Sequence, residues 1–370
     1  MSRFAIELAT ERHDSSLRQL FASNSMKGEI EISFRREPNY FHAAQTQGPF
    51  FQTFVYEEQQ TREVVGVGTR AIRPGFLNGR TAEIGYLGDL RLDSHVRGGL
   101  LIARAYRHLA QLHRDGRTRL YFTVIADGNQ QALATIASGR AGIPLYQDWG
   151  RIHSPAINLL RRMPSLDPDL EIIRADAGML PEIVDCLNRN NQKRQFAPFY
   201  RVEDFKSSDG WLRDFSPSDF YVARRDGRVI GVLGKWDQGA YKQTVVTRYS
   251  LKLRLMALLF NFAAPWIGCA RYPSIGTKFD YFYASFIAID EDNVPVFRAL
   301  LRTVYNDHAG SKYNYFLVGL HERDPLAAAL TDFVLTPFTA RLFTVHFEDG
   351  HAIYESLDRE RVPYIELAML

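Results

Sequence analysis

The strongest constraint on the fold is an internal repeat, because the two halves of this 370-residue chain carry the same succession of segment patterns. The first half runs LRLDSHVRGGLLIARAYRHLAQLHRDGRTRLYFTVIADGNQQALA from Leu90, and the second runs IAIDEDNVPVFRALLRTVYNDHAGSKYNYFLVGLHERDPLAAAL from Ile287. Each stretch predicts a strand, a loop, a helix, a second strand, and then a polar turn into an alanine-rich helix. A chance match would have to hold over many elements, so the repeat indicates two units of one fold.

The earlier part of each half fits the same scheme. A strand followed by a helix is expected at residues 4–23 and again at 170–190, and a hairpin pattern comes next in both halves. Between the halves, the stretch RRMPSLDPDLEIIRA (161–175) has two prolines and two aspartates that interrupt the apolar pattern. We therefore predict one domain at residues 1–165 and a second at 166–370.

The order of the segments predicts the fold class. Strand–helix–strand succession implies a partly parallel sheet with helices packed on it. The expected fold is α/β, a layered α+β arrangement of two tandem domains, each a mixed, partly parallel twisted sheet flanked by helices.

Composition narrows the possible partners. Hydrophobic residues make up 46% of the chain and charged residues 24%, which is typical of a globular protein, and a net charge of +3 gives no case for nucleic acid. Cys186 and Cys269 lie far apart and the histidines lack ligand spacing, so we expect neither a disulfide framework nor a metal site. The first residues have no long apolar core, so no signal peptide is expected, and a cytoplasmic location follows.

One apolar segment tests that expectation. The stretch LMALLFNFAAPWIGCA (255–270) is shorter than the roughly 20 residues that a membrane span needs, and Pro265 and Gly268 interrupt it. We expect a buried helix here and no membrane contact. A membrane-surface helix remains the alternative, because Arg248, Lys252 and Arg254 precede the segment.

The loop before the first repeated helix is a candidate anion site. Gly98 and Gly99 leave the backbone of the first helical turn uncovered, and the first amides of a helix have no internal acceptor. Arg97 adds a guanidinium, and Arg104 lies within one or two turns. The alternative is a glycine loop that serves only a tight turn, with the arginines on a solvated face.

These features resemble the acetyl-coenzyme-A-binding core of the GNAT acyltransferase superfamily. The matching residues are Leu90 and Leu92 on the strand, the loop from Arg97 to Leu101, and Asn129 with Ala132 in ADGNQQALA. The stretch SGRAGIPLY (138–146) resembles the helix end and the following strand of that family. As topology the resemblance covers most of both halves, whereas as motif it is specific only within the first half.

The resemblance implies a cofactor, acetyl-CoA or another acyl-CoA, and a way of binding it. The backbone of Leu90 and Leu92 would pair with the amide-containing arm of coenzyme A where the strand splays. The acyl carbonyl would lie beside the splay, where a backbone N–H stabilises developing negative charge. The other implied contacts are the amides of Gly98, Gly99, Leu100 and Leu101 on the pyrophosphate, the charges of Arg97 and Arg104, and Asn129 from the next helix.

The catalytic groups are less defined than the cofactor contacts. A general base is sought on the strand before the loop, where Glu83 and Asp89 are the carboxylates, and for each the alternative is a surface or hydrogen-bonded structural carboxylate. The tyrosine that the family often uses as an acid falls near Ser138 here, so Tyr146 is the substitute candidate, with a buried sheet tyrosine as its alternative. The loop is also shorter than the family pattern, since Leu100 and Leu101 stand where glycines are expected.

The second half departs from the anion-binding pattern. Asp290, Glu291 and Asp292 stand where a pyrophosphate would lie, and Pro295 suits a first helical turn. Asp292 or Asn293 is the expected cap, which predicts a self-capped helix and a copy without cofactor. In the first half, the segment 34–41 (FRREPNYF) is expected on sequence alone to be a salt-bridged loop, whereas the family resemblance implies the lining of an acceptor pocket.

The sequence therefore predicts an N-acyltransferase, in the simplest case an acetyltransferase, that moves an acyl group from coenzyme A to a small-molecule or peptide amine by direct attack. Two alternatives remain: an inactive binding or regulatory protein of the same fold, and an acyltransferase for long chains at a membrane surface. The oligomeric state is left open.

Overall fold

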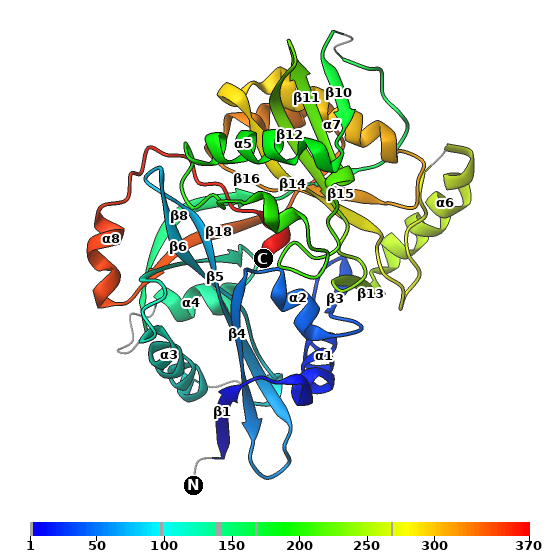
Figure 1. Ribbon diagram of the computed structural model, residues 1–370. Helices are drawn as coiled ribbons and strands as arrows, with labels where there is room; N and C mark the ends of the chain where they lie inside the picture. The colour runs from blue at the N-terminus through cyan, green and yellow to red at the C-terminus, as the bar shows by residue number, and fades with distance from the viewer. Residues whose placement is uncertain (1–2, 97–98, 138–142, 167–168, 268) are drawn as a thin grey trace.

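The computed structural model describes residues 3–96, 99–137, 143–166, 169–267 and 269–370. It contains two large β-sheets and one small one, with helices on their faces (Figure 1). We call the large sheets the first sheet and the second sheet, in the order in which the chain enters them.

The first sheet has eight strands in the order β1-β4-β5-β6-β7-β18-β8-β16. Within it β6 and β7 pair in parallel, and each of the other neighbouring pairs is antiparallel. The strands are β1 (Phe4–Leu8), β4 (Phe50–Glu58), β5 (Val64–Leu77), β6 (Arg80–Leu92), β7 (Leu120–Ala126), β8 (Leu145–His153), β16 (Leu320–His321) and β18 (Thr339–His346).

The second sheet repeats this topology in the order β10-β11-β12-β14-β15-β9-β17. Its parallel pair is β14 with β15, the counterpart of β6 with β7, so the repeat predicted from the sequence is confirmed. The strands are β9 (Ala156–Asn158), β10 (Glu171–Arg174), β11 (Phe220–Arg225), β12 (Arg228–Trp236), β14 (Tyr281–Ile289), β15 (Tyr315–Val318) and β17 (Leu335–Thr336).

The two halves exchange strands. β18 comes from the second half but lies between β7 and β8 in the first sheet, and β9 comes from the first half but lies between β15 and β17 in the second. A third sheet also joins the halves, because β13 (Gln243–Tyr249) pairs with β3 (Ile30–Arg35), which pairs with β2 (Ser25–Met26). The division after residue 165 stays a prediction, and hydrogen bonds between strands join the two halves across it.

Helices cover both faces of each large sheet. Alternate residues of β4 face opposite layers: Val55 packs with α1 and α2, whereas Phe54 and Tyr56 pack against Leu101 and Ala105 of α3. In the second sheet α5 and α7 take the two faces in the same way (Figure 1). The helices are α1 (Asp14–Ser23), α2 (Tyr40–Gln45), α3 (Gly99–His113), α4 (Gln130–Ala137), α5 (Leu180–Asn191), α6 (Leu251–Ile267), α7 (Val294–His308) and α8 (His351–Glu355).

Helix α6 contradicts one prediction. The apolar segment that begins at Leu255 was expected to be buried, but Leu255, Leu259 and Phe262 are 62%, 65% and 73% exposed. The helix lies at the edge of the molecule, joined to the end of β13 (Figure 1). Only its inward side contacts the protein, where Ala264 is fully buried.

Candidate functional site

The site begins where the parallel pair of the first sheet separates. β6 and β7 pair only at Gly85 with Tyr121 and at Tyr86 with Phe122, although both strands continue further. At the vertex, the Thr123 hydroxyl donates to the Leu87 carbonyl at 2.7 Å. Beyond that bond the edge of β6 turns away from its neighbour, and we call this opening the first splay.

A β-bulge lies in the opening. Val67 of β5 pairs with Arg91 and Thr69 pairs with Gly88, so β6 contains one extra residue between two ladder positions. Asp89 accommodates it with φ of 55°, in the left-handed region that aspartate and asparagine tolerate better than most residues. Because of the bulge, the amides of Asp89 and Leu90 depart from the regular alternation of the strand.

The second sheet contains the same bulge at the equivalent position. Val232 of β12 pairs with Ala288 and Gly234 pairs with Ser285, so β14 contains one extra residue between these two positions. That residue is Phe286, and its φ is also 55°. β14 pairs with β15 only as far as Ala284, so a second splay opens beside this bulge.

The second splay is occupied by the chain itself. The Phe286 N–H donates to Glu366 Oε2 at 2.7 Å, and the Ile287 N–H donates to the Tyr364 hydroxyl at 3.1 Å. The Tyr364 hydroxyl in turn donates to Glu366 Oε2 at 2.8 Å. Burial raises the pKa of the Glu366 carboxyl group. A bulge of this shape therefore presents two consecutive amides to oxygen atoms, one of them a carboxylate oxygen.

The first splay has no such plug. Among the described residues, the amides of Asp89 and Leu90 form no hydrogen bond outside the β5–β6 ladder. Leu90 is 48% exposed, whereas Ile287 at the equivalent position is buried. The two bulges thus share one backbone geometry and differ in what covers them.

The Asp89 side chain projects toward the layer of α1 and α2. Its Oδ2 accepts a hydrogen bond from Gln47 Nε2 at 2.8 Å and one from the Tyr40 hydroxyl at 3.4 Å. Burial raises the pKa of Tyr40, and the Asp89 charge raises it further. The hydroxyl is therefore a stable donor at neutral pH.

Buried cations surround this carboxylate. Within the described part of the chain, Arg36, Arg91 and Lys242 form no ion pair with an aspartate or glutamate side chain, although each acts electrostatically on its neighbours here. The Arg91 guanidinium lies 4.2 Å from the centre of the Phe21 ring, and burial lowers its pKa. Burial lowers the pKa of Lys242 to about 7, and the charge of Arg36 adds to the effect.

Lys242 also links the site to the C-terminal segment. Its Nζ donates to the carbonyl oxygen of Ala368 at 2.9 Å and to that of Leu370 at 3.2 Å. Arg36 belongs to the segment 34–41, and Glu37 of the same segment pairs with Arg18, as expected for a salt-bridged loop. The acceptor-pocket lining that the resemblance implies stays a prediction.

The predicted anion site is only partly described. Arg97 and Gly98 lie outside the described residues. α3 begins at Gly99, so Gly99, Leu100 and Leu101 form its first turn, where amides lack intrahelical acceptors. The Leu101 side chain is buried against Phe54 and therefore serves the core.

Three further predicted contacts have definite places. Leu92 ends β6 and pairs with Gly66 of β5, so it borders the splay. Arg104 Nη2 donates to the Phe4 carbonyl at 2.8 Å, which directs it toward β1. Asn129 precedes α4, where its Oδ1 accepts from the Ala132 amide at 3.1 Å.

Glu83 and Tyr146 are not brought to the splay. Glu83 is exposed, pairs with Pro74, and lies on the other side of the β6–β7 pairing from Asp89. Tyr146 lies on β8, which β7 and β18 separate from β6. Its hydroxyl contacts that of Tyr106 at 2.9 Å, and burial raises its pKa.

The helix start of the second half is self-capped, as predicted. Asn293 Oδ1 accepts from the Val296 amide at 3.1 Å, and Pro295 occupies the first turn of α7. Asp290 accepts from Arg189 at 2.9 Å, and this guanidinium helps to lower the pKa of the Asp290 carboxyl group against the effect of its burial. The acidic loop is therefore committed to internal contacts.

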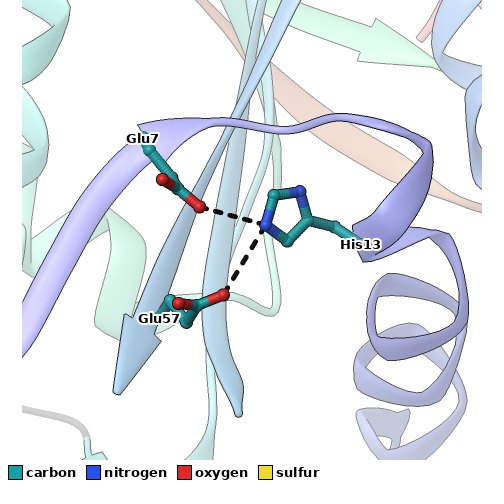
Figure 2. A group of neighbouring side chains, drawn as sticks. All are labelled: Glu7, His13 and Glu57. Atoms are coloured by element: carbon teal, nitrogen blue, oxygen red, sulfur yellow. Dashed lines mark hydrogen bonds and ion pairs between the residues drawn. The ribbon is translucent and has the colours of Figure 1, made fainter. Parts of the chain in front are cut away.

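A cluster of Glu7, His13 and Glu57 lies at the outer end of the first sheet (Figure 2). His13 Nε2 is 3.1 Å from Glu7 Oε1 and 3.7 Å from Glu57 Oε2. His13 Nδ1 accepts from the Thr10 amide at 2.9 Å, and Nε2 faces both the Arg12 Nε–H at 3.1 Å and the Glu7 carboxylate. A metal ion at Nε2 would need the ring proton on Nδ1, against the Thr10 N–H, and would displace Arg12 from Nε2. Arg62 already pairs with Glu57 at 2.6 Å. Hydrogen bonds and ion pairs among these side chains therefore explain the cluster without a metal ion.

Comparison with known proteins establishes the fold. Saccharomyces cerevisiae N-myristoyltransferase, crystallised with bound myristoyl-CoA, superimposes with a TM-score of 0.62 over 93% of this chain and 83% of its own, at 9% identity. A GCN5-related N-acetyltransferase from Anabaena variabilis superimposes with a TM-score of 0.52 over 92% of this chain and 72% of its own, at 11% identity. No protein-family model matches the sequence. The chain therefore has the GNAT fold that its sequence resembles.

Proposed function

We propose that this chain, which has the fold of acyl-CoA-dependent transferases, is an N-acyltransferase whose reaction centre is the first splay. The observation that carries the proposal is the pair of equivalent bulges at Asp89 and Phe286. In the second sheet the bulge amides hold an internal carboxylate and hydroxyl. The uncovered amides of Asp89 and Leu90 would hold the carbonyl oxygen of an acyl thioester in the same way.

The acyl-CoA would lie along the open edge of β6. Its pyrophosphate would face the first turn of α3 at Gly99, Leu100 and Leu101, with Arg97 and Asn129 as further contacts. The yeast enzyme binds myristoyl-CoA, whereas the Anabaena protein is described as an acetyltransferase, so donors of both lengths are tested below.

The proposed reaction transfers the acyl group directly from coenzyme A to the amine, with no covalent enzyme intermediate. The neutral amine attacks the carbonyl carbon, and a C–N bond forms as negative charge moves onto the oxygen between the Asp89 and Leu90 amides. The oxyanion then collapses, the C–S bond breaks and coenzyme A leaves as a thiolate. The proton of the new ammonium would pass to the carboxylate of Asp89, the residue whose own amide borders the splay, directly or through one water.

The cation cluster favours the reactive form of the acceptor. An amine attacks only when it is unprotonated, and a buried amine beside Arg36 and Arg91 loses its proton at lower pH than in water. Lys242 is an internal example, because burial and Arg36 lower its pKa to about 7. An acceptor amine in this environment would be largely neutral at physiological pH.

The experiment combines binding and turnover. Isothermal titration with acetyl-CoA and with myristoyl-CoA measures donor binding, and thiol release with a panel of amines and N-terminal peptides measures transfer. Asp89→Asn removes the base but keeps a residue that accepts positive φ, so we expect kcat/KM to fall by about 10²–10⁴-fold with donor binding unchanged.

The matched control is Asp226→Asn. Asp226 also has positive φ, 51°, but it lies in an exposed hairpin of the second sheet, so activity should not change. Equal turnover by Asp89→Asn and wild type would refute the assignment of the base. Donor binding without transfer to any acceptor would instead identify a binding protein of this fold.

A further inference from the structure

Helix α6 carries an apolar stripe that the protein does not cover. Six large side chains of this helix are between 62% and 87% exposed. They recur at helical spacing and therefore share one face. They are Leu251, Leu255, Leu258, Leu259, Phe262 and Trp266. Globular proteins rarely expose so many large apolar groups together unless they bind something.

The charges on α6 are placed as at a lipid surface. On a helical projection, Lys252 lies on one side of the stripe and Arg254 on the other, and both are exposed. The sequence of α6 contains no aspartate or glutamate. Long cationic side chains beside an apolar stripe can reach the headgroups while the stripe enters the acyl region.

A surface cavity adjoins the helix, and its wall carries three cationic side chains and one carboxylate, Asp280. It has a volume of about 820 Å³, and Asn261 and Phe262 of α6 form part of its wall. Arg271, Lys278 and Lys312 line the same cavity, with hydroxyl and amide groups between them. Lys278 Nζ donates to the Gly239 carbonyl at 3.1 Å and lies 3.8 Å from Asp280, and Lys312 Nζ lies 3.5 Å from Asp237. Surface ion pairs of this length are weak, and each ammonium group has three donors, so both lysines keep a donor for a phosphate group.

We propose that α6 binds the surface of an anionic membrane. The stripe would lie in the interface, Lys252 and Arg254 would sit at headgroup level, and the cavity would receive a lipid phosphate. None of the helices in the described ranges is long and apolar enough to cross a bilayer, so the helix lies on the membrane. A second copy of the chain is a poorer occupant, because two such faces would bring their cations together.

The test measures binding to vesicles and needs no catalysis. The full chain is floated with phosphatidylcholine vesicles that contain phosphatidylglycerol, and with vesicles of phosphatidylcholine alone. We expect strong binding only to the anionic vesicles. Lys252→Gln and Arg254→Gln should each lower the partition coefficient by about fivefold, the effect of one cation near an anionic surface.

The apolar contribution is tested separately. Leu259→Glu should lower the partition coefficient by at least about tenfold, because it removes a large apolar group from the interface. Val334→Glu, at another exposed apolar residue, is the control that should bind like the wild type. Unfolding curves confirm that each variant is folded.

Three outcomes would overturn the proposal. The first is equal binding of Leu259→Glu and wild type, and the second is absence of binding to anionic vesicles at low salt. The third is a wild-type dimer that Leu259→Glu dissociates while vesicles recruit neither form, which would make the stripe an interface between copies.

Discussion

Replacing Glu366 tests directly whether the second splay is closed by the chain. Glu366 Oε2 accepts from the Phe286 N–H at 2.7 Å and from the Tyr364 hydroxyl at 2.8 Å, and Oε1 accepts weakly from the Ala368 N–H at 3.4 Å. Glu366→Ala leaves both strong donors buried without an acceptor. Each such loss costs about 1–3 kcal/mol, so we expect a decrease of about 3 kcal/mol in the free energy of unfolding.

Glu366→Gln separates the hydrogen bonds from the charge. The glutamine oxygen can accept from Phe286 and Tyr364, and only the weak contact with Ala368 is lost. We therefore expect this variant to lie within about 1 kcal/mol of the wild type at neutral pH. Urea unfolding followed by tryptophan fluorescence measures both variants, with an unchanged m-value as the check for two-state behaviour.

The pH dependence adds a second readout. Because burial raises the pKa of Glu366 above its ordinary value of 4.5, its stabilising effect is present at low pH and is lost as the pH rises through the folded pKa. The stability of Glu366→Gln relative to the wild type should thus rise as the pH increases above 4.5. Equal stability of the alanine and glutamine variants at all pH values would refute the argument that Glu366 serves the bulge amides.

Three more expectations concern stability. A Cβ on Gly85 would lie 2.0 Å from the buried Tyr121 ring, so Gly85→Ala should destabilise the chain by about 3 kcal/mol in urea unfolding. Burial lowers the pKa of Lys242 to about 7, so stability should rise from pH 7 to 9 by up to about 1.4 kcal/mol per pH unit, and Lys242→Met should flatten this rise. Burial, with the charge of Lys235, lowers the pKa of His308 to about 4, so stability should fall as the pH decreases from 6.5 toward 4, and less so in His308→Phe.

Each of these has a clear contrary result. Gly85→Ala with wild-type stability would mean that the Tyr121 ring moves aside. If the stability of Lys242→Met still rises with pH above 7 as steeply as that of the wild type, groups other than Lys242 cause the rise. If His308→Phe loses as much stability as the wild type when the pH falls below 6.5, groups other than His308 cause that loss.

The repeat made the topology predictable, because alternating apolar patterns and capping residues are local signals. The self-capped start of α7 at Asn293 was predictable for the same reason. The exchange of β9 and β18 was not, because a strand pattern does not specify which sheet it joins. The bulges were missed as well, since one extra residue changes the alternation too little to be noticed in either half.

The site was predictable in part. Asp89 and the segment containing Arg36 lie together at the first splay, whereas Glu83 and Tyr146 lie elsewhere, because sequence distance along β6 does not reveal where β7 leaves it. Lys242 and Glu366 gave no sequence signal, as they reach the bulges from segments far along the chain. The α6 prediction was wrong because apolar content alone does not distinguish a buried helix from one that faces outward.

The most direct measurement is a crystal structure with a stable acyl-CoA analogue in which a methylene group separates sulfur from the carbonyl carbon. The account predicts density between β6 and β7, with the analogue carbonyl oxygen within hydrogen-bond distance of the Asp89 or Leu90 amide and Glu366 still in the second splay. Density between β14 and β15 with Glu366 displaced, or no density at either splay, would contradict it.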